Sequence, residues 1–164
     1  MTNFPADPIF SDSRIYRDIA VEALSASESA FSAGSRPKED GSSGRVLAYD
    51  PEHRSFKQSM IAIVFAGLYI EARLWLHGCS RLGIAKYRSI DRRPLEDRLP
   101  ALGVSDAMLR DDLKEYRESR KSLVHEKPVP LSMETSPTRV AQTEAAKAMA
   151  LMDRVDRALA DSAT

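Results

Sequence analysis

Apolar residues recur every three or four positions along most of the chain, which is the spacing of one face of an α-helix. No stretch combines strict alternation with the β-branched composition that is typical of strands. We therefore predict an all-α protein, an up-and-down helical bundle of four long helices plus one short helix. The long helices are expected at residues 11–33, 51–82, 105–125 and 137–160, and the short helix at residues 94–102.

Proline, glycine and capping residues mark the predicted ends of these helices. Pro51 and Pro94 suit the first turn of a helix, where a missing N–H costs nothing. Asp50 and Ser105 are the expected N-caps of the helices that follow them. Gly103 is expected to end the short helix.

The composition indicates a single folded domain. The chain has 164 residues, of which 43% are hydrophobic, enough to bury a sizeable core. We expect one domain overall, with residues 1–50 as an N-terminal helix and polar loop and residues 51–164 as the bundle core. The single cysteine excludes a disulfide framework and favours a reducing compartment.

The last two long helices carry apolar seams in which the spacing alternates between four and three residues. Such a seam is typical of a helix packed at a shallow angle in a bundle. The seam of the helix expected at residues 105–125 consists of Leu109, Leu113, Tyr116, Arg120 and Leu123. The seam of the last helix consists of Ala141, Ala145, Ala148, Met152, Val155 and Leu159.

The longest apolar run covers residues 60–70 and is apolar nearly all round a helix. We expect other helices to surround it. Its length of 11 residues is well short of the roughly 20 that span a bilayer, and Glu71 and Arg73 follow it. The N-terminus lacks the basic flank and apolar stretch of a secretory signal. We therefore expect no membrane contact and a cytoplasmic location.

The charges balance, with 24 basic and 24 acidic side chains. A protein that coats nucleic acid through bulk positive charge is therefore not expected, and contact with phosphate has to come from a local patch. One such patch is predicted at residues 73–93, a segment that contains six basic side chains and a single acidic one, Asp91. A solvated connection between helices is the alternative interpretation of this segment.

Arg120 stands where the seam of its helix calls for an apolar residue. A guanidinium at such a position needs a partner or an opening to water, because an unpaired buried charge is costly. Glu71 is one candidate partner across the bundle, although it could equally face water beside Arg73. His125 follows five residues later, about 140° around an ideal helix from Arg120.

The segment Arg120-Lys-Ser-Leu-Val-His125 resembles the Arg-x(4–6)-His motif of the HEPN superfamily. Members are all-α bundles that carry the motif at the end of a late helix, and an aliphatic residue often precedes the histidine, as Val124 does here. The architectural resemblance covers roughly residues 55–159, and the residue-level resemblance covers about residues 116–128. Many nuclease members carry a small polar residue after the arginine, where this chain has Lys121.

The resemblance implies a metal-independent endoribonuclease that needs no cofactor, with Arg120 and His125 as the catalytic pair. It also implies a homodimer with a composite site, a role as a toxin or defence effector, and an antitoxin or regulatory protein as a further partner. His titrates near neutrality and suits proton transfer, and the planar guanidinium of Arg fits two phosphate oxygens.

Five cations are predicted to bind RNA around this pair, with Tyr87 available for stacking on a base. They are Arg117 and Lys121 on the motif helix and Arg88, Arg92 and Arg93 in the basic segment.

Two other interpretations remain open. A HEPN-like module without catalysis would bind RNA, nucleotide or protein, and Lys121 and the neutral net charge favour it. An unrelated helical bundle would serve as an adaptor, since 17 Arg and 3 His make the motif spacing common by chance. No metal site is expected, because His53, His77 and Cys79 lack a second ligand pair at a usual spacing.

Overall fold

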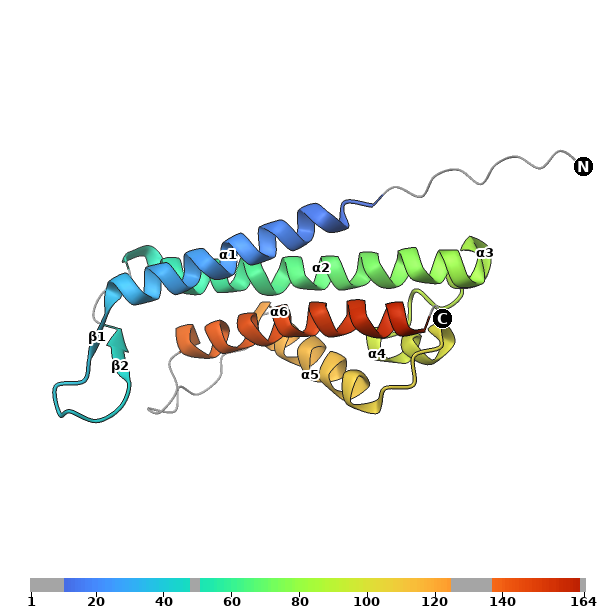
Figure 1. Ribbon diagram of the computed structural model, residues 1–164. Coiled ribbons are helices and arrows are strands. Elements are labelled where there is room, and N and C mark those ends of the chain that lie inside the picture. Colours follow the sequence, from blue (N-terminus) through green and yellow to red (C-terminus); the bar gives the residue numbers. More distant parts are fainter. Residues whose placement is uncertain (1–10, 48–50, 125–136, 163–164) are drawn as a thin grey trace, which may run out of the picture.

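The computed structural model describes residues 11–47, 51–124 and 137–162, and it confirms an all-α helical bundle (Figure 1). Four long helices form the bundle, and two short helices and one strand pair lie in the connections. The long helices are α1 (Ser13–Gly34), α2 (Arg54–Leu82), α5 (Ala107–Val124) and α6 (Pro137–Asp161); the short ones are α3 (Ile84–Tyr87) and α4 (Leu95–Arg98). Single 3-10 turns, η1 (Pro51–His53) and η2 (Leu99–Leu102), precede α2 and follow α4.

Helix α2 is the centre of the fold, with α1 along one side and α6 along the other (Figure 1). The predicted seam of α6 is confirmed, because every member of it is buried. The first three positions of the α5 seam, Leu109, Leu113 and Tyr116, are buried as well. The core therefore includes α2 and the seams of α5 and α6, as the four-three spacing predicts, together with the buried residues of α1 and of the segment that holds α3, α4 and η2.

Small residues let α1 approach α2 closely. Ala20, Ala23 and Ser27 form the buried face of α1. The Ser27 hydroxyl donates to the Ser55 carbonyl at 2.9 Å and lies 2.7 Å from the hydroxyl of Ser59. Because these buried hydroxyls satisfy one another, the polar contact can sit inside the core without a desolvation penalty.

The structure corrects several predicted boundaries. Helix α2 begins at Arg54 and not at Pro51, because Glu52 and His53 have left-handed backbones with φ of 62° and 54°. The N-cap of α5 is Asp106 and not Ser105, since the Asp106 carboxylate accepts a hydrogen bond from the Leu109 N–H at 2.9 Å. Gly103 ends η2 with φ of 79°, as predicted.

Two further corrections concern the connections. The polar loop contains a short antiparallel strand pair, β1 (Ser35–Pro37) and β2 (Arg45–Leu47), although no strand was expected. Backbone hydrogen bonds and the Arg45 guanidinium, which donates to the Ser35 hydroxyl at 2.7 Å, hold this hairpin, so side-chain alternation gives no signal for it. Helix α3 also replaces part of the connection expected at residues 83–93.

Helix α2 passes the length and hydropathy test for a membrane span. Its most apolar window has a mean hydropathy of 1.5, and 44% of that window is buried inside the bundle. A core helix of a folded domain passes the same test, so this criterion alone does not make α2 a membrane span. Its length in the fold, 29 residues, exceeds the apolar run that the sequence shows.

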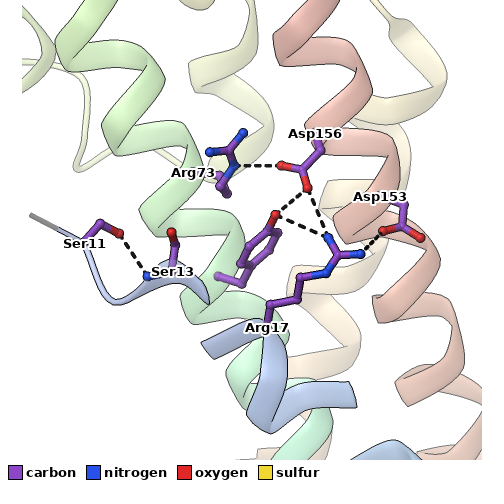
Figure 2. Close-up of polar contacts among 7 residues, drawn as sticks. Ser11, Ser13, Arg17, Arg73, Asp153 and Asp156 are labelled. Carbon is purple, nitrogen blue, oxygen red and sulfur yellow. Dashed lines mark hydrogen bonds and ion pairs between the residues drawn. The ribbon is translucent and has the colours of Figure 1, made fainter. Parts of the chain in front are cut away.

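A carboxylate on α6 ties α1 and α2 to that helix (Figure 2). Asp156 accepts hydrogen bonds from the Tyr69 hydroxyl, from Arg17 Nη1 at 3.2 Å and from Arg73 Nε at 2.7 Å. Arg17 also donates to Asp153 at 2.7 Å. Three donors from two other helices thus converge on one carboxylate, and this network fixes how α1, α2 and α6 sit against each other.

Removing the Asp156 carboxylate should destabilise the fold more than removing its neighbour. Asp156 is 25% exposed and satisfies three donors, whereas Asp153 is 50% exposed and, within the described part of the chain, pairs with Arg17 alone. Asp156→Ala should cost about 2 kcal/mol of unfolding free energy and the matched control Asp153→Ala less than about 1 kcal/mol. Urea unfolding measures both, and equal costs would contradict the assigned role of Asp156.

Candidate functional site

Arg120 lies at the edge of the core, on the face of α5 that meets α2. Its side chain is 30% exposed, whereas Tyr116, one turn earlier in the same seam, is buried. The seam of α5 therefore opens to solvent at Arg120, which explains how a guanidinium can occupy the fourth seam position without the full cost of burying a charge.

A glycine on α2 makes room for this guanidinium. A methyl group at Gly67 would lie 2.7 Å from Arg120 Nη1 and 2.6 Å from the Tyr116 hydroxyl oxygen, both closer than such contacts allow. The Tyr116 hydroxyl donates to the Ile63 carbonyl at 2.6 Å. The Arg120 guanidinium packs against Gly67 and Tyr116, so packing as well as charge sets the position of this guanidinium.

Glu71 is the carboxylate that faces Arg120. Arg120 Nη1 and Glu71 Oε1 are 3.5 Å apart, so of the two positions considered for Glu71 the structure shows the one across the bundle. Glu71 is 46% exposed, and an ion pair of this length and exposure is worth at most about 1 kcal/mol. In the described part of the chain, Nε and Nη2 of Arg120 have no partner and remain available to an anion.

His125, the second member of the predicted catalytic pair, lies outside the described residues. Helix α5 is described up to Val124, the residue before it. The convergence of Arg120 and His125 therefore stays a prediction.

Arg117 has a structural contact that the sequence did not indicate. Its guanidinium donates to Glu96 Oε1 from Nη2 at 2.8 Å and from Nε at 3.1 Å. The Glu96 side chain is only 7% exposed, so this ion pair clamps α4 to α5 and satisfies a buried carboxylate. Lys121 is exposed and stays a predicted RNA contact, and so does the partly exposed side chain of Arg117.

The three arginines of the basic segment, Arg88, Arg92 and Arg93, are exposed and stay predicted RNA contacts.

Tyr87 is not available for stacking on a base, so this expectation was wrong. The residue is fully buried, and its ring lies against Gly78 and edge-on to Trp75 at 5.3 Å. A connection between helices was expected to be solvated, but α3 folds back onto α2 and carries Tyr87 into the core.

A groove of about 270 Å³ lies between α5 and α6. Tyr116, Ala148 and Leu151 line it, and charged residues of both helices flank it. Lys147 on α6 pairs with Glu115 on α5 at 2.9 Å, and Arg154 pairs with Asp112. These pairs span the groove and satisfy its charges, so we assign the groove to the packing of α6 on α5.

The described residues contain no group of three or more His, Cys, Asp or Glu side chains that could hold a metal ion. His77 lies 3.2 Å from the Ser162 hydroxyl, and partial burial lowers the pKa of His77. Cys79 is buried, and burial raises the pKa of its thiol, which makes it a poor nucleophile.

Comparison of the chain with protein-family models, curated proteins and solved structures finds no match.

The buried hydroxyl of Tyr116 should make the stability of the protein fall at alkaline pH. Burial raises the pKa of Tyr116 well above its usual value, and the nearby Arg120 offsets part of that rise. The folded state therefore keeps this proton while the unfolded chain loses it above about pH 10. The stability that the protonated Tyr116 hydroxyl contributes to the fold is fully present below that pH, and it is lost as the pH rises through the raised pKa.

The variant Tyr116→Phe isolates this effect. It should be less stable than the wild type by about 1 kcal/mol at about pH 8, because the hydrogen bond to the Ile63 carbonyl is lost. The difference should shrink at about pH 11, since only the wild type carries the titrating hydroxyl. Urea unfolding at both pH values tests this, and a constant difference would contradict it.

Proposed function

We propose that this chain is a HEPN-like, metal-independent endoribonuclease whose phosphate-binding group is Arg120. The observation that carries the proposal is a guanidinium in an otherwise apolar seam, packed against Gly67 and Tyr116 and paired, among the described residues, with the Glu71 carboxylate at 3.5 Å. A side chain with a purely structural charge would be expected in a close, buried pair, as Glu96 is with Arg117.

Arg120 is suited to stabilising the charge that develops during RNA cleavage. Attack of a ribose 2′-oxygen on the adjacent phosphorus places extra negative charge on the nonbridging oxygens. A guanidinium whose Nε and Nη2 have no partner in the described part of the chain presents two donors side by side, and these match two such oxygens. Because its packing fixes Arg120 in advance, little reorganisation is needed when that charge appears.

His125 would carry the proton steps in this proposal. A base takes the proton from the 2′-hydroxyl as the new O–P bond forms, and an acid gives a proton to the 5′-oxygen as its bond to phosphorus breaks. The products are a 2′,3′-cyclic phosphate and a free 5′-hydroxyl. Both steps suit an imidazole near neutral pH, and two copies of the chain would supply one imidazole for each.

Binding without cleavage is the second candidate, and Glu71 favours it. Its carboxylate competes with phosphate for Arg120. Lys121, which follows the motif arginine, also favours binding without cleavage. In that case the protein would hold RNA, nucleotide or protein at the same surface without chemistry.

Cleavage of a random-sequence RNA oligonucleotide in the presence of EDTA tests the proposal. The wild type should produce 2′,3′-cyclic phosphate ends. Arg120→Ala should lower the rate about 100-fold or more, as loss of an oxyanion donor does. His125→Ala should lower it by a similar factor or more. Arg110→Ala is the matched control, because Arg110 lies on the same helix and is 53% exposed in a pair with Asp97.

The proposal fails if the folded wild type leaves the RNA intact, or if Arg120→Ala and Arg110→Ala cleave equally well. RNA binding without cleavage, lost in Arg120→Ala, would establish the second candidate in its place. Circular dichroism of each variant separates loss of chemistry from loss of fold.

A further inference from the structure

A compact turn that follows α2 carries exposed cations on a firm support (Figure 1). Successive backbone hydrogen bonds run from the Tyr87 N–H to the Gly83 carbonyl, from Ile90 to Tyr87 and from Arg93 to Ile90. Tyr87 and Ile90 are buried in the core and anchor the turn, so the side chains between and beside them face solvent. We call the cations of this segment the basic turn, and they are Lys86, Arg88, Arg92, Arg93 and Arg98.

The cations of the basic turn form no ion pair within the described part of the chain. Four of them are exposed, and Arg98 is partly exposed. Arg98 Nε donates to the backbone carbonyl of Arg93 at 2.8 Å, which keeps these two arginines together and leaves both charges unpaired. By contrast, the arginines that do contact a carboxylate are Arg17, Arg36, Arg73, Arg110, Arg117, Arg120 and Arg154.

The acidic residues of the same segment do not cancel this charge. Glu96 is buried and accepts from Arg117 at 2.8 Å, and Asp97 pairs with Arg110 at 2.8 Å. Two arginines of α5 thus neutralise both of these carboxylates. Asp91 is the one other acidic residue of residues 83–98, against the five cations of the turn. An excess of positive charge therefore remains on this surface and attracts a polyanion.

The side chains of the turn suit a phosphate backbone better than bases or lipid. Most of the cations are arginines, whose planar guanidinium matches pairs of phosphate oxygens. Tyr87 is the only aromatic residue among residues 83–98, and it is buried, so no ring can stack on a base. Ile84, 43% exposed, is the only exposed large apolar side chain of these residues, which leaves little to insert into a lipid surface.

We propose that the basic turn binds RNA through its phosphate backbone alone, without recognition of the bases. The site is formed by α3, α4 and the connection between them, and Arg120 of α5 is not part of it. The turn holds a long strand, and any preference for a base has to come from other contacts. That the polyanion is RNA rests on the proposed function, whereas the binding of a phosphodiester backbone does not.

Binding of 2′-O-methyl RNA strands of about 20 nucleotides to the full chain tests the site, because such strands lack the attacking 2′-hydroxyl and stay intact. Fluorescence anisotropy should give dissociation constants for poly(U) and poly(C) strands that agree within about threefold, since phosphates carry no sequence information. The logarithm of the association constant should fall against the logarithm of the salt concentration with a slope of about −3, at about 0.7 for each phosphate contact.

Charge reversal at three exposed positions locates the site. The variant Arg88→Glu/Arg92→Glu/Arg93→Glu should weaken binding about 100-fold and bring the salt slope to about −1, because three phosphate contacts are lost. The matched control is Arg14→Glu/Lys57→Glu/Arg157→Glu, which changes the net charge equally at exposed cations of α1, α2 and α6. The control should weaken binding by less than about threefold. Circular dichroism checks the fold of both variants.

Equal losses in the two triple variants would overturn the site, because net charge alone would then explain binding. Loss of binding in Arg120→Ala that the turn variant does not show would overturn it as well, and so would a preference of more than about tenfold between the two strands. Association with phosphatidylserine vesicles in place of RNA would assign the turn to a lipid surface. The expected binding without cleavage of unmodified RNA would support the site and contradict only the proposed function.

Discussion

The close approach of α5 to α2 at Gly67 is the constraint on which the candidate site depends. With a side chain at this position, neither the Tyr116 hydroxyl nor the Arg120 guanidinium could occupy its place. Tyr116 uses the space to reach the Ile63 carbonyl, and Arg120 uses it to lie on the helix surface beside Glu71. One missing side chain on α2 thus allows a charge to replace an apolar residue in the seam of α5.

The central helix has a different task on each face. Its buried sides hold α1 and α6, and the Asp156 network fixes these helices with ion pairs at their outer edge (Figure 2). At Gly67, where α2 has no side chain, Tyr116 and Arg120 of α5 pack against the helix.

The sequence predicted the long helices and both seams, because the four-three spacing follows from helix geometry and is visible in one dimension. It also marked Arg120, since a cation in a seam breaks the pattern. It could not show that Tyr87 is buried, because that depends on how α3 folds back onto Gly78. The Arg117–Glu96 clamp and the hairpin at residues 35–47 were missed for the same reason, as both depend on contacts between separate segments.

The measurement that tests this account most directly is the cost of Gly67→Ala in two backgrounds. Alanine has the higher helix propensity by about 1 kcal/mol, so the substitution should be neutral or stabilising wherever the added methyl group meets nothing. In the wild type, urea unfolding should show a loss of about 1 to 3 kcal/mol, because the methyl group meets Tyr116 and Arg120. In the Tyr116→Phe/Arg120→Ala background that loss should disappear. An equal cost in both backgrounds would show that Arg120 does not rest on Gly67 and would contradict the account.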